Sequence, residues 1–273
     1  MRLNLNLRPA AAAAILIVLT ALTSCTSKMQ QYVDAANDEC PVNFVTGILT
    51  SVELNDKAVV FNIEVNEKEL TTIENLKKNP NMLKQMWKML FIEEKETPSK
   101  KDFLNLIASQ GMGVRLNYMS IDNHAKNFSI NIGNSEFKSM LKNPVTIDEQ
   151  IQTQVDFSKV SLPQQLDSAT TMVDTKIEDG FIVYIYDIDE QRLTMSEMES
   201  KQQTYRDNIS TLINNVFTDP SSPVGDFFRM IGKKGWGIRY SYKGNASGKV
   251  LNIDFTNDQL KQMETSNNFT GNP

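Results

Sequence analysis

A formal net charge of −5 over 273 residues, with an isoelectric point near 5.1, sets the first limits on this chain. An acidic surface repels nucleic acid and anionic lipid headgroups, so we expect neither as the main electrostatic partner. The single histidine, His124, excludes metal sites and catalytic triads built from several histidines. Carboxylates are plentiful but scattered, and no pair recurs in both repeats with acid/base geometry. We therefore expect no metal, no cofactor and no enzymatic activity, and a lysine- or carboxylate-based site is the alternative.

The first 25 residues have the order of features that a secretory signal requires. Arg2 and Arg8 precede an apolar run, 10–22, that is too short to span a bilayer permanently. The run ends in Leu22-Thr23-Ser24-Cys25, which resembles the lipobox of bacterial lipoproteins. The resemblance implies cleavage before Cys25, a lipid such as palmitate on its thiol, and attachment to the membrane in the cell envelope. An ordinary signal peptide or an N-terminal anchor helix is the alternative.

A tandem duplication sets the organisation of the rest of the chain. Between 102–118 and 226–242, seven of 17 positions are identical, where chance gives roughly one. The polar stretch before the first repeat predicts a short tether or a leading helical turn. The domains expected are a signal peptide at 1–24, a tether at 25–39, repeat 1 at 40–142, a linker at 143–160, repeat 2 at 161–264 and a disordered tail at 265–273.

Each repeat begins with a hairpin whose turn contains Asn, Asp or Gly, continues with two helical segments, and closes with two strands and a helix. Asn79-Pro80 should break or kink the first helical segment of repeat 1, whereas Gln202 and Gln203 allow a continuous helix in repeat 2. Gly111 and Gly235 should cap the next helix. The unit is therefore ββααββα, an α+β fold with a four-stranded antiparallel sheet and helices on one face. The expected strands are 45–52, 58–65, 112–120 and 127–132 in repeat 1, and 172–177, 181–188, 236–242 and 250–255 in repeat 2.

Arg115 and Arg239 occupy the same strand position in the two repeats and alternate with apolar residues, so they face away from the helices. One interpretation is cross-strand ion pairing, of Arg115 with Glu64 and of Arg239 with Asp187 or Asp254. Such pairs contribute only some tenths of a kcal/mol each. The other interpretation is a platform for an anion or a peptide, centred on the two arginines.

Trp87 is a third candidate binding residue. Its counterpart in repeat 2 is Ser210, which predicts a solvent-facing position where an exposed tryptophan could contact a partner. We expect Trp236 in the core, and we assign the Tyr118/Tyr242 pair to maintenance of the fold.

Cys40 is the one thiol left once Cys25 is lipidated, so no internal disulfide is available. A lone cysteine in an oxidising compartment is either reactive or a small buried hydrophobe. Repeat 2 has no cysteine at the matching position, so the fold does not demand one.

Cys40-Pro41, followed by a hairpin, Asn-rich helices and a closing hairpin, resembles uncharacterised lipoproteins of Bacteroidetes, and the resemblance implies no known activity. Surface-exported members of that group commonly carry an acidic stretch after the lipidated cysteine. Thr26-Ser27-Lys28-Met29 departs from it and favours a periplasm-facing position. We expect a lipid-anchored, non-enzymatic binding or assembly module for a protein or peptide partner. The alternatives are a ligand-binding or hydrolytic envelope protein with a site between the repeats, and a structural spacer.

Overall fold

The computed structural model describes residues 28–44, 46–68, 71–92, 98–219 and 222–268, so the signal segment with Cys25 lies outside the described residues. The chain divides into two compact units at Thr146/Ile147. We call residues 28–146 the N-terminal unit and residues 147–268 the C-terminal unit. Each is an α+β unit with one five-stranded mixed sheet.

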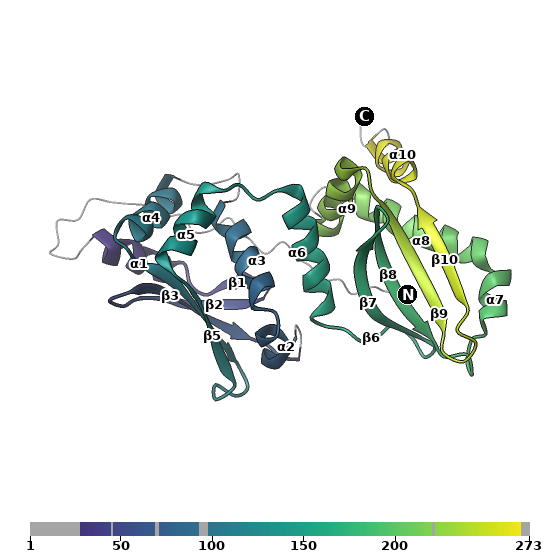
Figure 1. The fold of residues 1–273 in the computed structure, drawn as a ribbon, viewed down its shortest axis with the longest axis horizontal. Coiled ribbons are helices and arrows are strands. Elements are labelled where there is room, and N and C mark those ends of the chain that lie inside the picture. The colour runs from purple at the N-terminus through teal and green to yellow at the C-terminus, as the bar shows by residue number, and fades with distance from the viewer. Residues whose placement is uncertain (1–27, 45, 69–70, 93–97, 220–221, 269–273) are drawn as a thin grey trace. The chain divides into compact units, whose positions relative to one another are not determined.

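The N-terminal unit has the element order α-β-β-β-α-α-α-β-β-α (Figure 1). Its elements are α1 (Lys28–Asp38), β1 (Val42–Phe44), β2 (Gly47–Leu54), β3 (Ala58–Val65), α2 (Ile73–Lys77), α3 (Pro80–Ile92), α4 (Pro98–Ser109), β4 (Gly113–Ser120), β5 (Asn127–Ile132) and α5 (Asn134–Lys142).

The C-terminal unit repeats this order. Its elements are α6 (Ile147–Lys159), β6 (Gln164–Gln165), β7 (Thr170–Glu178), β8 (Phe181–Ile188), α7 (Met195–Ser200), α8 (Gln202–Thr218), α9 (Pro223–Lys234), β9 (Gly237–Gly244), β10 (Val250–Phe255) and α10 (Asn257–Asn268). The tail predicted to be disordered is helical as far as Asn268.

The sheets differ from the predicted four-stranded antiparallel sheet in two ways. Each has five strands, in the orders β1-β2-β3-β4-β5 and β10-β9-β8-β7-β6. The central pairs, β3 with β4 and β8 with β9, are parallel. The physical reason is the connection: three helices separate the two strands of each central pair, so the chain returns to the starting end of the sheet before the second strand begins. The extra strands, β1 and β6, are short edge strands that pair with β2 and β7.

The segments predicted as tether and linker are corresponding helices of the repeat. In α1, Met29, Tyr32, Val33 and Ala36 are buried at helical spacing, and α1 packs on β2 and α4. In α6, Ile151 and Val155 are buried, and α6 packs on β7 and α9. A cis proline peptide follows each helix, at Cys40-Pro41 and at Leu162-Pro163. In the structure each unit therefore begins with a helix that precedes the repeat starts predicted at 40 and 161.

In the helical region the predictions of a break at Pro80 and of a glycine cap were confirmed, and the prediction of a continuous helix in repeat 2 was wrong. Pro80 begins α3, so the predicted break is present. Gly235 adopts the left-handed conformation with φ 81° and caps α9, and Gly111 has φ 76°. The helix predicted to be continuous in repeat 2 is interrupted at Lys201, which ends α7 and precedes α8. The interruption therefore belongs to the repeat and does not depend on proline.

In β4 and β5 alternate residues are buried on the helix-facing side, and the residues between them are more accessible on the other side, which we call the open face. The open face is not uniformly exposed, because Val60 and Asn62 on β3 and Val183 on β8 are buried there as well. In the N-terminal unit the core contains a chain of aromatic rings, from Phe61 through Trp87 and Phe91 to Phe137, with centroids 5.2–5.5 Å apart. Figure 1 shows α3, α4 and α5 together on one side of this sheet. The open face is where the two predicted arginines lie.

Candidate functional site

Trp87 is buried, which overturns its prediction as an exposed partner contact. Only 3% of its surface is accessible. Its Nε1–H donates to the hydroxyl of Tyr118 over 2.9 Å, and the Tyr118 oxygen lies 3.3 Å from Thr46 Oγ1. The substitution by Ser210 in repeat 2 misled the prediction, because a large residue in one copy and a small one in the other also fits a difference in core packing.

Arg239 forms the predicted pair with Asp254. Its Nε and Nη2 donate to the two carboxylate oxygens, each over 2.8 Å, in a bidentate arrangement. Its guanidinium carbon also lies 4.6 Å from the centroid of the Phe181 ring. Its charge is therefore satisfied within its own sheet.

Arg115, the counterpart of Arg239, is exposed and has a different environment. Its Nε donates to Asn131 Oδ1 over 2.8 Å, and Asn131 stands where repeat 2 has Asp254. The predicted pair with Glu64 does not form, and Glu64 instead lies 3.6 Å from His124. Within the described part of the chain no carboxylate pairs with Arg115. Its remaining guanidinium donors are therefore open to an external group.

A row of hydrogen-bonded polar side chains crosses four strands of the open face beside Arg115. Ser129 Oγ donates to Asn117 Oδ1 over 2.7 Å, and Asn117 Nδ2 donates to Asn62 Oδ1 over 3.0 Å. Asn62 Nδ2 then donates to Ser51 Oγ and Glu53 Oε1, over 2.9 and 2.8 Å. We call these five residues the amide row. Because each amide is held by its neighbours, the row presents a fixed pattern of donors and acceptors.

Repeat 2 does not reproduce the amide row. Ile185 stands at the position of Asn62, and Ser241 at that of Asn117. The apolar Ile185 side chain interrupts any hydrogen-bonded path across β8. The open face of the N-terminal unit thus combines two features that its copy lacks, an arginine without a carboxylate and a continuous polar row.

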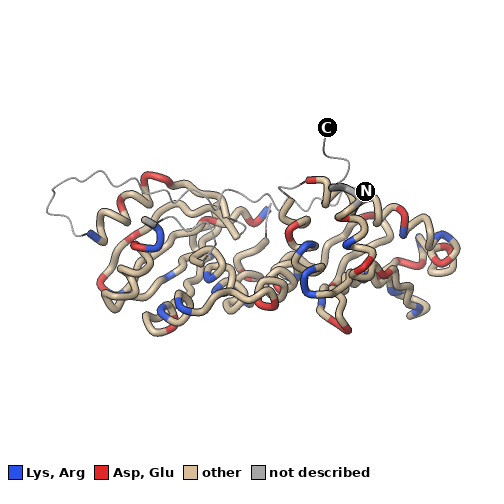
Figure 2. The backbone as a smooth tube through the Cα atoms, turned by 90° about the horizontal axis from the view of Figure 1, so that it is seen from above, with Lys and Arg blue, Asp and Glu red and all other residues tan. Residues whose placement is uncertain are grey.

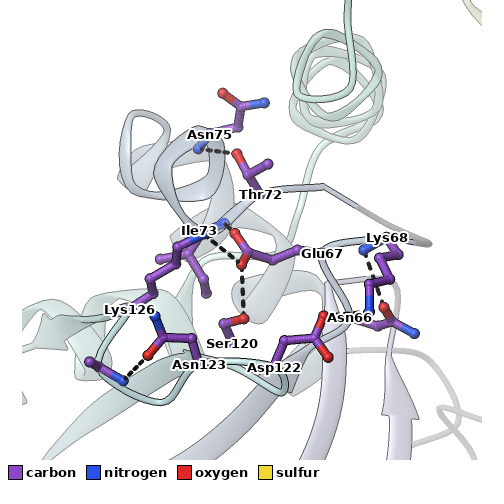
Figure 3. Close-up of polar contacts among 11 residues, drawn as sticks. Asn66, Glu67, Lys68, Thr72, Ile73, Asn75, Ser120, Asp122, Asn123 and Lys126 are labelled. Carbon is purple, nitrogen blue, oxygen red and sulfur yellow. Dashed lines mark hydrogen bonds and ion pairs between the residues drawn. The ribbon is translucent and has the colours of Figure 1, made fainter.

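Glu67 is the centre of a second polar cluster, shown in Figure 3. Its carboxylate accepts from the amide of Ile73 at the start of α2 over 3.0 Å, from Ser120 Oγ over 2.8 Å and from Lys126 Nζ over 3.2 Å. The Ile73 amide makes the largest contribution to lowering the pKa of Glu67, followed by the Ser120 hydroxyl. Lys68 and Asp122 form an exposed ion pair at 2.9 Å nearby.

Glu190 has the corresponding hydrogen-bonding role in repeat 2, which identifies the Glu67 cluster as part of the fold. Glu190 accepts from the amides of Ala246 and Ser247, and the Ser247 amide is the main cause of its lowered pKa, with a contribution from the Met195 amide at the start of α7. Gly244 stands where repeat 1 has Ser120; a Cβ there would lie 2.5 Å from Glu190 Oε2, so the glycine permits the close approach. In both units a glutamate ties a helix N-terminus to the closing hairpin.

Two asparagines that we did not single out from the sequence also have matching roles. Asn134 Nδ2 donates to the carbonyls of Ala108 and Met112, at the end of α4 and just beyond. Asn257 Nδ2 donates to the carbonyls of Gly232 and Trp236. Both satisfy carbonyls at a helix C-terminus. An asparagine repeated at the first position of the last helix was the signal available in the sequence.

Cys40 is half-buried, and its Sγ donates to the carbonyl of Ala36 over 3.3 Å. Burial raises the pKa of its thiol, and the neighbouring Glu39 carboxylate adds to the effect. A thiol with a raised pKa has little thiolate at neutral pH, so the environment favours the packing interpretation.

The described residues contain no group of three or more His, Cys, Asp or Glu side chains placed to hold a metal ion. Over the same residues, no helix has both the length and the apolar character needed to cross a membrane. Acidic and basic residues are interspersed along both units (Figure 2).

Comparisons with known proteins assign no family. No family model matches the chain, and no curated protein matches it. Among solved structures it is similar to a Pseudomonas aeruginosa protein described as a "putative secreted protein (PA3611)", with 13% identity and a TM-score of 0.34 over 42% of this chain and 92% of that one.

Proposed function

We propose that this chain is a lipid-anchored cell-envelope protein whose N-terminal unit binds a protein or peptide partner that presents a carboxylate. The binding is non-enzymatic, and the site is the open face around Arg115 and the amide row. The observation that carries the proposal is the contrast between Arg115, which has no carboxylate partner in the described residues, and Arg239, which has a bidentate one.

The contrast matters because the two arginines hold the same place in the same fold. If the fold needed an ion pair at this position, both copies would keep the carboxylate. Repeat 1 instead has Asn131, whose amide positions the guanidinium through Nε and leaves the terminal nitrogens unused. A guanidinium held in this way matches a carboxylate bidentately.

The neighbouring amide row supports a peptide as the group that brings the carboxylate. Asn117 and Ser129 lie on β4 and β5, the strands that carry Arg115 and Asn131. Amide and hydroxyl groups complement the N–H and C=O groups of a peptide backbone. A charged hydrogen bond at the centre of such a contact contributes about 1.5–3 kcal/mol, which is about tenfold or more in affinity.

Selection of peptides from a displayed random library on the full chain tests this site. We expect the selected peptides to contain Asp, Glu or a free C-terminal carboxylate at a common position. Arg115→Gln should weaken their binding about tenfold or more, and Arg239→Gln, the matched control, should leave it unchanged. Selected peptides without a common carboxylate, or equal losses in the two variants, would contradict the proposal.

The anchor is tested separately at Cys25. The lipobox resemblance implies that Cys25→Ser leaves the chain unprocessed and abolishes labelling by a palmitate analogue. Normal maturation of that variant would contradict lipidation without affecting the Arg115 site. Protease shaving of intact cells would then test the periplasm-facing orientation that the sequence after Cys25 favours.

A further inference from the structure

Four tyrosines form a square on the helix-facing side of the sheet in the C-terminal unit. Tyr184 and Tyr186 on β8 lie opposite Tyr240 and Tyr242 on β9 in parallel register. The rings are nearly parallel, with centroids 5.5 Å apart for Tyr184 and Tyr240, 5.0 Å for Tyr186 and Tyr242, and 6.3 Å for Tyr186 and Tyr240. We call these residues the tyrosine quartet. The four rings therefore lie on one face of the sheet at neighbouring positions.

None of the four hydroxyls has a hydrogen-bond partner among the described residues, although the rings pack against the core. Burial raises the pKa of all four, to values well above that of a free tyrosine. The four oxygen atoms are nevertheless not fully enclosed, so each keeps some accessible surface. Tyr184, Tyr240 and Tyr242 also keep part of their surface accessible. Hydroxyls at such depth are normally bonded to protein or to water.

Repeat 1 shows that the fold does not require this arrangement. Its residues at the four positions are Phe61, Ile63, Leu116 and Tyr118, so only one hydroxyl is present. That hydroxyl is satisfied by Trp87, a residue replaced by Ser210 in repeat 2. The C-terminal unit has thus gained three hydroxyls and lost the tryptophan that bonds the fourth.

The charged groups beside the quartet restrict what it can bind. Asp167 is close enough to raise the pKa of Tyr205 and Tyr242, and Glu197 also acts on Tyr205. The cation of the neighbourhood, Arg206, is engaged elsewhere: its guanidinium carbon lies 4.9 Å from the centroid of the Phe255 ring, which packs edge-on to Tyr240, and its Nη2 donates to Gln259 Oε1. The charged side chain that acts on the quartet is therefore Asp167, so an anionic ligand is disfavoured.

Two classes of ligand remain, an amine and an uncharged molecule with several hydroxyls. The balance of hydrogen-bond donors and acceptors distinguishes them. An ammonium group would use only the oxygen lone pairs and would leave four phenol protons without acceptors. A ligand with several hydroxyls can accept those protons and donate its own to the phenol oxygens and to Asp167. We propose that the tyrosine quartet is a binding site for an uncharged, hydroxyl-rich ligand of the saccharide class. This site is independent of the Arg115 site and lies in the other unit.

Calorimetric titration of the full chain, in a detergent that contains no sugar, tests the site. The probes are maltose, cellobiose, lactose and chitobiose at millimolar concentrations, with spermidine as the amine probe. We expect at least one disaccharide to bind, and Tyr186→Phe and Tyr240→Phe each to weaken it about tenfold. Because these hydroxyls have no protein partner, both variants should keep the melting temperature of the wild type. Arg115→Gln should bind the sugar normally, which separates this result from the first proposal.

Three results would overturn the assignment. They are binding of none of the four sugars, binding of spermidine alone, and sugar affinity unchanged in both phenylalanine variants. A large fall in melting temperature in either variant would also count against it, since it would mean that the hydroxyl already serves the fold.

Discussion

Tyr118 and Tyr242 occupy the same position in the two repeats, but removal of their hydroxyls should change the free energy of unfolding by different amounts. Tyr118→Phe deletes the acceptor of the Trp87 N–H, a bond of 2.9 Å between two buried side chains, and also the contact with Thr46. A buried donor left without a partner costs about 1–3 kcal/mol, so we expect a loss of about 2 kcal/mol. Tyr242→Phe deletes a hydroxyl with no partner among the described residues. We expect it to change the free energy of unfolding by less than about 0.5 kcal/mol.

The chain contains one tryptophan in each unit, which allows the two effects to be measured separately. In a chain labelled with 5-fluorotryptophan, the fluorine signal of Trp87 reports on the N-terminal unit and that of Trp236 on the C-terminal unit. Urea titration followed by fluorine NMR gives the unfolding midpoint of each. A Tyr118→Phe effect below about 0.5 kcal/mol, or equal losses in the two variants, would refute the reasoning.

The other predictions concern residues shared by, or different between, the repeats. The pKa of Glu67 and of Glu190 is lowered from 4.5 in the folded state, so the stabilisation from these carboxylates is present above that pH and is lost as the pH falls through the folded values. In acid titrations the stability of Glu67→Gln and Glu190→Gln should therefore depend less on pH than that of the wild type. An unchanged slope would contradict the assignment. Cys40 should react with a maleimide more slowly than a free thiol at neutral pH, because its pKa is raised; a rate equal to that of free cysteine would be inconsistent with this environment. Asn134→Ala and Asn257→Ala should each cost about 1–3 kcal/mol by leaving helix carbonyls unpaired, measured by urea unfolding; losses confined to one unit would show that the two roles differ.

The duplication predicted the α+β class, most strands and the glycine caps, because these depend on local patterns that both copies carry. It did not predict the parallel central pair. Strand alternation gives the faces of β3 and β4, but the direction of pairing depends on the path of the chain through three helices. The short edge strands were missed because two or three residues give no period.

The segment of α1 was predicted as a tether or a leading helical turn, so the full helix was not predicted, and α6 was missed as a linker. The outer faces of both helices are polar, and the segments were interpreted from their overall composition. The spacing of Met29, Tyr32, Val33 and Ala36 was available in the sequence and matches a helix with one buried face.

For the candidate site, the sequence identified the two arginines but not the difference between them. Arg239 and Asp254 were paired correctly, whereas Arg115 was assigned to Glu64, which the register places on β3 beside Met119. Trp87 was predicted to be exposed to solvent because repeat 2 has a serine at that position. The comparison of two repeats shows which residues differ, but it does not show how each core is packed. The tyrosine quartet needed the parallel register before its members could be recognised as neighbours.

The most direct test of the central claim is photo-cross-linking in intact cells from one position on each open face. A benzoylphenylalanine at Asn127 lies on β5, the strand next to that of Arg115 and outside the amide row, and one at Val250 occupies the matching place on β10. The account predicts a discrete partner cross-linked from Asn127, lost in Arg115→Gln and retained in Arg239→Gln, with no such product from Val250. A product from both positions, or one from Asn127 that survives Arg115→Gln, would contradict it.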